Sequence, residues 1–244
     1  MTKLRAGIIG TGSRKKPPSA LGYHMAYEHA KAYSEIEACE LVACADISPE
    51  NGAEFAEACN VTAYLDYNEM FAAENLDMVS ICTWMHLHER MVLDAIKAGV
   101  KVIHCEKPMA ADWGGAKRIA AAAKEAGVQL TFNHQRRYGA PFFMAKELYE
   151  KGVIGKLVRQ EVECGNIYEG GTHFIDMMSF FQGEVPAKWV LAAIDARTEA
   201  IVFGMHNENQ QIVLTEYENG VFGLIMTGAG GARPHRDGRP AVTP

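Results

Sequence analysis

Residues 4–12 read LRAGIIGTG, an apolar run that enters a turn with two glycines. The run from Leu4 to Ile9 has the length of a buried β-strand. Gly10 and Gly12, separated by Thr11, permit a tight turn and let the backbone approach a pyrophosphate at the start of the next helix. A G-x-G motif is weak evidence on its own, so its interpretation depends on what the rest of the chain adds.

The next helix and the second strand add two further parts of a dinucleotide site. The third glycine of the usual fingerprint is missing from its normal place, and residues 13–23, beginning with Ser13, form an insertion. Ala26, in the helix that follows, can take the third position because alanine is tolerated there. Asp46 ends the second strand about 20 residues further on, where a carboxylate accepts hydrogen bonds from ribose hydroxyls. Together these residues predict a Rossmann unit that binds a nicotinamide dinucleotide.

The choice between NAD and NADP depends on the charges near this site. The carboxylate of Asp46 would repel a 2′-phosphate, which favours NAD. The basic run Arg14-Lys15-Lys16 could fold back and admit NADP, or it could be a solvated loop. NAD is therefore the expected cofactor, with NADP as the alternative.

From the start of the chain to about Phe132, short apolar runs alternate with helical patterns, which is typical of βαβ units and a parallel sheet. We therefore expect an α/β domain at residues 1–132, a doubly wound parallel sheet of Rossmann type that binds NAD(P). Asp112 suits a helix N-cap, and Gly127 suits the residue after that helix. The predicted strands are Leu4–Ile9, Glu40–Ala45, Met78–Cys82, Lys101–His104 and Val128–Phe132, and the predicted helices include Leu87–Ala98 and Trp113–Ala126.

Residues 133–226 show a different pattern. Strand-like segments follow one another without intervening helices, which predicts a smaller α+β domain with a mainly antiparallel sheet. Residues 227–244 are rich in Gly, Pro and Arg and have almost nothing to bury, so we expect a disordered tail. The elements predicted for the second domain are helices at Pro141–Lys151 and Phe174–Phe181, and strands at Leu157–Cys164, Lys188–Ile194, Ile201–Met205, Gln211–Tyr217 and Val221–Met226.

The composition favours a globular protein that acts on a small molecule. Of 244 residues, 48% are hydrophobic and 22% are charged, and the formal net charge of −6 argues against nucleic-acid binding, which needs a basic face. No apolar stretch approaches the roughly 20 residues of a membrane span, and the first residues lack a signal-peptide pattern. The six cysteines are scattered without a CxxC pair, as expected for reduced core residues. We therefore expect a soluble, cytoplasmic protein with no membrane or nucleic-acid partner.

An ordered set of short motifs extends from about Leu4 to Met226. Glu106-Lys107-Pro108 comes directly after a predicted strand. The other motifs are Ile81-Cys82-Thr83 with His88, Ala98-Gly99-Val100, Asn133 with Arg136-Arg137, and Gly171-Thr172-His173-Phe174-Ile175-Asp176. This set resembles the Gfo/Idh/MocA family of sugar and cyclitol oxidoreductases. The resemblance implies an NAD(P)-dependent dehydrogenase that acts on CH–OH groups of a sugar, inositol or related polyol.

The resemblance also implies roles for individual residues. In that family the lysine of Glu-Lys-Pro lies beside the nicotinamide and the substrate, and Lys107 there can stabilise charge on the reacting hydroxyl; its alternative is a solvated surface lysine. His173 is implied as the general acid/base, because neutral imidazole can accept the hydroxyl proton near physiological pH. Asp176 either orients His173 or caps and packs its helix. The expected cofactor contacts are Gly10, Thr11, Gly12, Ser13, Asp46, Thr83, Trp84, His88, Glu106 and Lys107, and the expected substrate contacts are Lys107, Asn133, Arg136, His173 and Asp176.

The sequence departs from the family pattern in three places. Glu169 stands four residues before His173, where the family commonly has an aspartate, and we keep Glu169 as a catalytic candidate. Trp84 replaces the proline that usually follows Thr83, so its ring either lines the cofactor pocket or packs in the core. The second domain is shorter than in the family, which would expose a sheet edge or face. A homo-oligomer that covers this sheet, a natural abbreviation and an inactive copy are the alternatives.

Other chemistries have less support. His86 and His88 with Cys82 and Cys105 are soft-metal ligands, but histidines two apart on a helix diverge and the nicotinamide does the redox work, so no metal is expected. A serine hydrolase lacks its GxSxG motif. Two rival functions stay open: an NAD-dependent glycosidase that uses transient oxidation, and a non-catalytic ligand sensor or degenerate paralogue.

Overall fold

A computed structural model describes residues 3–15 and 24–228 of the chain. The chain divides into two compact units, Met1–Asn133 and His134–Pro244, and each unit is described by itself. Within the described residues, no helix combines the length and the apolar character that crossing a bilayer would require.

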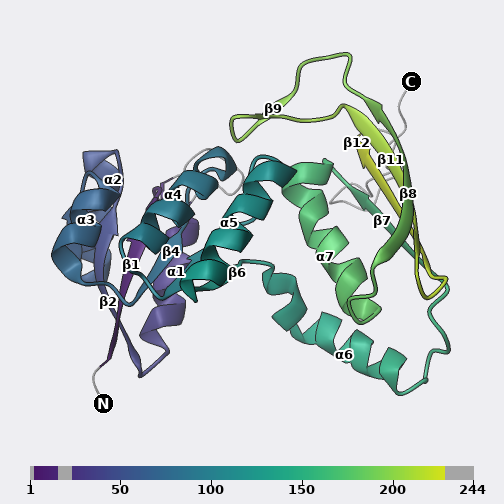
Figure 1. Ribbon diagram of the computed structural model, residues 1–244, viewed down its shortest axis with the longest axis horizontal. Helices are drawn as coiled ribbons and strands as arrows, with labels where there is room; N and C mark the ends of the chain where they lie inside the picture. The colour runs from purple at the N-terminus through teal and green to yellow at the C-terminus, as the bar shows by residue number, and fades with distance from the viewer. Residues whose placement is uncertain (1–2, 16–23, 229–244) are drawn as a thin grey trace. The chain divides into compact units, whose positions relative to one another are not determined.

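The first unit is built around a parallel sheet (Figure 1). Across its described residues, six strands take the order β3-β2-β1-β4-β5-β6, and each neighbouring pair is parallel. The chain moves outward from β1 to β3 and then returns to β4 on the other side of β1, so the strand order reverses there. This arrangement confirms the predicted Rossmann fold. The strands are β1 (Leu4–Ile9), β2 (Cys39–Ala45), β3 (Thr62–Tyr64), β4 (Met78–Ile81), β5 (Val102–Cys105) and β6 (Gln129–Phe132).

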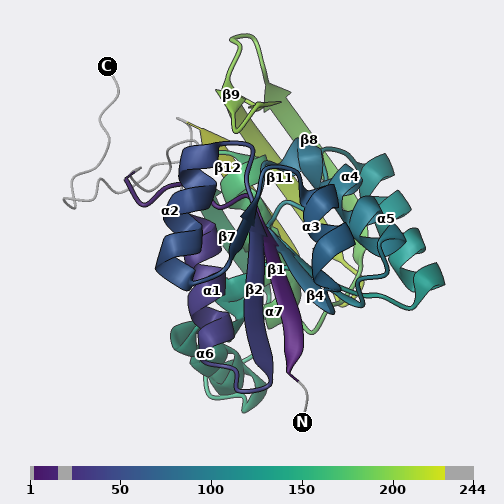
Figure 2. The same cartoon turned by 90° about the vertical axis from the view of Figure 1, so that its left-hand side faces the viewer.

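Helices cover both faces of this sheet (Figure 2). On one face, α1 and α2 contribute Tyr27 and Phe55 to a cluster that includes Ile8 of β1. On the other face, α3, α4 and α5 contribute buried side chains such as Met70 and Ile119 to a second cluster. Because both faces are covered, the central strands are almost continuously apolar. The helices are α1 (Met25–Ser34), α2 (Pro49–Cys59), α3 (Tyr67–Glu74), α4 (Met85–Lys97) and α5 (Trp113–Ala126).

Local sequence explains where two of these helices begin. Asp112 caps α5, since its carboxylate accepts a hydrogen bond from the Gly115 amide at 2.7 Å. The same helix ends at Gly127, whose φ of 65° lies in the left-handed region. Both features agree with the prediction. Ser48 caps α2 in the same way, by accepting a hydrogen bond from the amide of Asn51 at 3.3 Å.

The second unit has its own sheet, with the order β7-β12-β11-β8. β11 is antiparallel to both β8 and β12, whereas β12 and β7 are parallel, so the predicted mainly antiparallel sheet is confirmed. On one face, Phe174 and Met178 of α7 pack against Val213 and Ile225. The elements are α6 (Ala140–Glu150), β7 (Arg159–Cys164), α7 (Thr172–Phe181), β8 (Ala187–Asp195), β9 (Ile201–Val202), β10 (Met205–His206), β11 (Gln210–Tyr217) and β12 (Phe222–Gly228), with a 3₁₀ turn at Gln135–Tyr138 and a π turn at Ile167–Gly171.

Two predicted elements of the second unit differ from the structure. The single strand expected at Ile201–Met205 is instead a hairpin of β9 and β10, because the chain turns back at Phe203 and Gly204, which have φ of 49° and 77°. The sequence predicts a tail from Thr227 onward, but β12 continues to Gly228, and Thr227 is buried there. The rest of that expected tail lies outside the described residues.

Candidate functional site

The glycine turn after β1 has a backbone geometry suited to a dinucleotide. Gly10 has a φ of 83° and Gly12 a φ of 59°, values that side chains rarely allow. A Cβ atom on Gly10 would lie 2.7 Å from the Cγ2 of Thr83 and 3.0 Å from the carbonyl oxygen of Cys82. A side chain at Gly10 would therefore push the ends of β1 and β4 apart.

Asp46 holds this turn from the end of β2. Its Oδ2 accepts hydrogen bonds from the Thr11 amide at 2.8 Å, the Thr11 hydroxyl at 2.9 Å and the Gly12 amide at 3.2 Å. Its Oδ1 accepts one from the Ser48 amide at 2.8 Å. Since each carboxylate oxygen has two lone pairs, Oδ1 retains capacity for another donor. Asp46 can therefore shape the turn and still bind a ligand hydroxyl.

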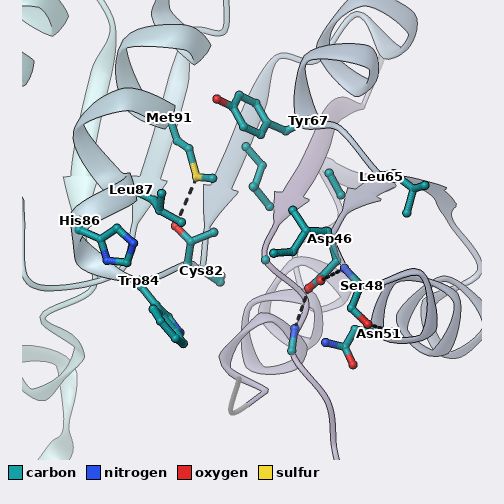
Figure 3. Close-up of a pocket in the computed structure, with 16 residues that line it drawn as sticks. Asp46, Ser48, Asn51, Leu65, Tyr67, Cys82, Trp84, His86, Leu87 and Met91 are labelled. Atoms are coloured by element: carbon teal, nitrogen blue, oxygen red, sulfur yellow. Dashed lines mark hydrogen bonds between the residues drawn. The ribbon is translucent and has the colours of Figure 1, made fainter. Parts of the chain in front are cut away.

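A cavity of about 470 Å³ opens beside the glycine turn (Figure 3). It lies at the carboxyl ends of β1, β2 and β4, where the strand order reverses and open α/β sheets bind their ligands. Figure 3 shows polar side chains on one side of the cavity and mainly apolar ones on the other. The polar side chains are Asp46, Ser48 and Asn51, and the mainly apolar ones are Trp84, Leu87 and Met91.

These features fit a nicotinamide dinucleotide. Gly10 and Gly12 carry no side chain, so a diphosphate can approach the backbone of the turn at these two positions. Asp46 supplies a carboxylate for ribose hydroxyls, and the apolar wall suits a flat ring. All six cysteines of the chain are unbridged. Among the residues that the structure describes, no group of three His, Cys, Asp or Glu could hold a metal ion.

Trp84 is the N-cap residue of α4 and lines this cavity. Its ring meets that of His86 edge-on, with the centroids 5.8 Å apart. Trp84 thus lies at the cavity and is partly exposed, and its contact with the cofactor stays a prediction. The neighbouring Thr83 also lines the cavity, and its hydroxyl donates to the Sδ of Met91 at 3.3 Å.

Glu106, directly after β5, is buried and held by two hydrogen bonds. Its Oε1 accepts one from the Nδ2 of Asn133 at 2.7 Å and lies 2.9 Å from the Nε2 of His29. Burial acts to raise the pKa of Glu106, but the bonds from His29 and Asn133 and the charge of Lys107 outweigh it and lower that pKa below its usual 4.5. Glu106 is therefore an ionised carboxylate inside the first unit. The side-chain amide of Asn133, a predicted substrate contact, is thus hydrogen-bonded to this carboxylate.

Lys107 follows Glu106 and is half-buried. His88 braces the same segment, because its Nδ1 lies 2.8 Å from the carbonyl oxygen of Pro108 and its Nε2 lies 3.1 Å from that of Thr83. Burial lowers the pKa of His88 although both carbonyl contacts oppose this shift. His88 is fully buried and thus links the Glu-Lys-Pro segment to the start of α4 instead of facing the cavity.

The predicted cofactor contacts therefore separate into two groups. Half of them line the cavity, namely Gly10, Gly12, Asp46, Thr83 and Trp84. The others are not among the residues that line it, namely Thr11, Ser13, His88, Glu106 and Lys107. The amide and the hydroxyl of Thr11 donate hydrogen bonds to Asp46, and the hydroxyl of Ser13 donates one to Glu54 at 3.3 Å.

In the second unit, His173 occupies the first turn of α7 and is 6% exposed. Its ring lies edge-on to that of His134, with 5.8 Å between the centroids. Glu169 lies one turn earlier, in the π turn, where its amide donates to the Oδ1 of Asn166 at 2.7 Å. The two residues thus share one helical segment that Asn166 caps.

Asp176, the other predicted residue of α7, is paired with Arg137. The Nε of Arg137 donates to both oxygens of Asp176, at 2.8 and 2.7 Å, and its Nη1 donates to Glu184 at 2.6 Å. This ion pair gives Asp176 a structural partner other than His173. Arg136, a predicted substrate contact, stacks on Phe174 with its guanidinium carbon 4.4 Å from the ring centre.

Sequence reasoning missed several residues of the first unit. His29, Tyr33 and Ser80 join Glu106 in a buried polar cluster, and Ser48 and Asn51 line the cavity. The polar pair His29 and Tyr33, one turn apart on an otherwise apolar helix face, is a signal that could have marked the cluster. Nothing in the sequence indicated that Ser80 faces it.

The fold, the glycine turn and the cavity define a Rossmann-type unit that binds a nicotinamide dinucleotide. A family model described as an oxidoreductase family with an NAD-binding Rossmann fold matches residues 4–134. The chain belongs to this family, Gfo/Idh/MocA, and NAD is its cofactor.

Relatives of known name agree with this assignment. An inositol 2-dehydrogenase of Pseudomonas fluorescens is 30% identical over 178 residues, covering 71% of this chain and 49% of that protein. A myo-inositol 2-dehydrogenase of Thermotoga maritima is 25% identical over 238 residues, covering 91% and 67%. The solved WlbA dehydrogenase of Bordetella pertussis, a complex with NADH and UDP-GlcNAcA, has a TM-score of 0.79 at 23% identity and covers 93% of this chain and 70% of its own. The chain spans about half the length of the first curated relatives it matches.

Proposed function

We propose that this chain is part of a dehydrogenase that transfers a hydride between NAD and a secondary alcohol of a sugar, inositol or related polyol. The observation that carries the proposal is the cavity at the strand-order reversal, with its glycine turn and Asp46. The Glu106-Lys107-Pro108 segment follows these residues in the same unit. Relatives named as inositol dehydrogenases support the polyol class.

The residues divide the chemistry between them. Bound NAD supplies the acceptor for the hydride that leaves the carbinol carbon. The hydroxyl proton leaves at the same time, and His173 takes it on its imidazole. Lys107 hydrogen-bonds the alcohol oxygen and stabilises the charge that develops there. Asn133, Arg136 and Asp176 complete the proposed substrate side, and Glu169 is the proposed partner of His173.

We further propose that the second unit associates with another copy through the sheet face opposite α7. Strand register places Val213 and Ile225 on the α7 face, so alternate residues of β8, β11 and β12 point the other way. Three neighbouring positions on that opposite face are Leu191, Leu214 and Leu224, and Leu191 is 65% exposed. An apolar sheet face of this kind is a liability unless another surface covers it.

The test is cofactor binding followed by a polyol screen. We expect saturable binding of NADH that is tighter than that of NADPH, and reduction of NAD by at least one inositol or aldose. Lys107→Ala and His173→Ala should each lower kcat about 10²- to 10⁴-fold. Matched controls are Lys117→Ala and His206→Ala, which remove an exposed lysine and an exposed histidine and should leave kcat unchanged.

The rival functions give different results in the same assays. Release of a free sugar without net NADH would identify the glycosidase that uses transient oxidation. Binding of NADH without turnover of any polyol would identify the sensor or degenerate paralogue. Unchanged turnover in both Lys107→Ala and His173→Ala would show that the proposed catalytic residues are wrong.

A further inference from the structure

A chain of four polar side chains crosses the interior of the first unit. The hydroxyl of Tyr33 lies 2.6 Å from the Oγ of Ser80, which lies 3.0 Å from the Nδ1 of His29. The Nε2 of His29 lies 2.9 Å from the Oε1 of Glu106. Tyr33, Ser80, His29 and Glu106 are all at most 8% exposed. Buried polar groups of this kind are kept only where each finds a partner.

The chemistry of the groups fixes the direction of the bonds. An ionised carboxylate can only accept, so the Nε2 of His29 must carry the hydrogen that Glu106 receives. When this is the only hydrogen on the ring, Nδ1 accepts a hydrogen bond from the hydroxyl of Ser80, and Ser80 accepts one from Tyr33. Each hydroxyl and each ring nitrogen of these side chains thus has a neighbouring donor or acceptor as its partner.

These four side chains connect helix α1, strand β4 and the segment that follows β5. His29 and Tyr33 lie one turn apart on α1, the helix that follows the glycine turn. Ser80 lies in β4, and Glu106 and Asn133 directly follow β5 and β6. Two donors, on His29 and Asn133, converge on one oxygen of Glu106 and leave its carboxylate little rotational freedom.

We infer that His29 is a positioning residue: through its bond to Glu106 it fixes the Glu-Lys-Pro segment and hence the place of Lys107 at the nicotinamide end of the site. The inference rests on the proposed function for the role of Lys107, but the bond from His29 to Glu106 is testable without turnover. A catalytic lysine displaced by about 1 Å can lose 10²-fold in rate, so the support for its segment matters.

The first experiment follows Glu106 itself by carboxyl ¹³C NMR over a pH titration. In His29→Leu the Glu106 carboxylate loses a hydrogen-bond donor, so we expect the midpoint of its titration to lie at a higher pH than in the wild type. His29→Gln offers an amide donor at a similar place and should restore part of the shift. The titratable groups that face Glu106 within the described residues are His29, His88, His104, Lys107, Cys82 and Cys105.

His104→Leu is the matched control. The His104 ring lies 5.1 Å from that of His29, but its Nδ1 bonds Thr131 at 2.8 Å and not Glu106. If His29 merely fills space, the two leucine variants should behave alike. If His29 positions Glu106, the larger change of the midpoint belongs to His29→Leu, and Ser80→Ala, one step further along the chain, should give a smaller one.

The second experiment measures turnover with the substrate found in the polyol screen. We expect His29→Leu to lower kcat about 10²-fold, to change KM for NAD much less, and to shift the acid limb of the kcat profile upward; His29→Gln should recover most of kcat. An unmoved Glu106 midpoint, or a kcat and pH profile like those of His104→Leu, would overturn the inference. If the Glu106 midpoint moves in His29→Leu but the wild type turns over no polyol, the result would support the bond from His29 to Glu106 and overturn the proposed function.

Discussion

The two units of this chain bury their sheets to different extents. In β1 of the first unit, the positions from Ala6 to Ile9 are all buried, whereas in β8 of the second unit eight of nine positions are exposed. Helices cover both faces of the first sheet, and those packed on the second reach part of one face. Side chains of the described residues therefore cover both faces of the first sheet, whereas β8 of the second sheet stays largely exposed.

The two units also differ in how firmly they hold the candidate site residues. Glu106 and Asp46 each accept several hydrogen bonds inside a well-packed unit, so their geometry is set by that unit alone. His173 lies in a unit whose sheet is partly uncovered. We expect the cofactor side of the site to be robust and the substrate side to be sensitive to association.

Truncating one side chain in each unit should show the difference between the two units most strongly. Phe55 of α2 is fully buried, and Phe55→Ala should lower the free energy of unfolding of the first unit by about 3–5 kcal/mol. Leu191→Ala in β8 removes a side chain that is 65% exposed and should change stability by no more than about 0.5 kcal/mol in the isolated chain. Urea unfolding followed by circular dichroism measures both. Equal losses in the two variants would show that β8 is covered and break the comparison.

Much of the first unit could be predicted from the sequence because its signals are local. β1 and α5 have the predicted bounds, since an apolar run before a glycine turn and a capped amphipathic helix are both short-range patterns. The segment from α2 to α3 was missed. α2 contains Asn51 and Gly52, which are poor helix formers, and β3 has only three residues, Thr62–Tyr64. Tertiary packing, including Phe55 in the core, stabilises this segment.

The site was predictable to the extent that its motifs lie within one segment. Gly10, Gly12 and Asp46 were found because strand ends in a Rossmann unit come at fixed places in the sequence. His29 and Ser80 could not be assigned, because they are 51 residues apart and become neighbours only through the packing of α1 on the sheet. The roles of Lys107, His173 and Glu169 came from the resemblance and stay predictions.

Replacing the buried carboxylate of Glu106 should have the next largest effect on the free energy of unfolding. Glu106→Gln keeps the size of the side chain but weakens two bonds to a carboxylate, which should cost about 1.5–3 kcal/mol at pH 7. The folded pKa of Glu106 lies below its usual 4.5, so its contribution is fully present above that value and is lost as the pH falls through the folded pKa.

The measurement is the difference in unfolding free energy between the wild type and Glu106→Gln at several pH values. The difference should shrink on acidification below about pH 4.5. Glu218→Gln, at an exposed glutamate of the second unit, is the control and should show no such dependence. A difference that grows on acidification would contradict the ionised state of Glu106.

A smaller effect is expected at the start of α5. Asp112→Ala removes the acceptor of the Gly115 amide and should lower stability by about 1 kcal/mol. Asp112→Ser keeps an acceptor and should restore most of this loss. The helix α6 of the second unit has Gly139 at its N-cap and no side-chain cap, so Gly139 offers no comparable bond to remove. Thermal unfolding of the three proteins measures the contribution of the cap to the first unit.

The smallest effect on stability, and the sharpest on association, should come from a charge on the open face of β8. Leu191 and Val190 are neighbours, 65% and 58% exposed, and they point to opposite faces of the sheet. If copies meet through the face opposite α7, Leu191→Lys should yield monomers while Val190→Lys keeps the wild-type mass, because a lysine cannot be buried there without a partner. Both variants should unfold within about 0.5 kcal/mol of the wild-type monomer, since neither position is buried within the chain. Sedimentation equilibrium decides between the faces: loss of association in Val190→Lys alone would move the interface to the α7 side, and a monomeric wild type would contradict association through this sheet.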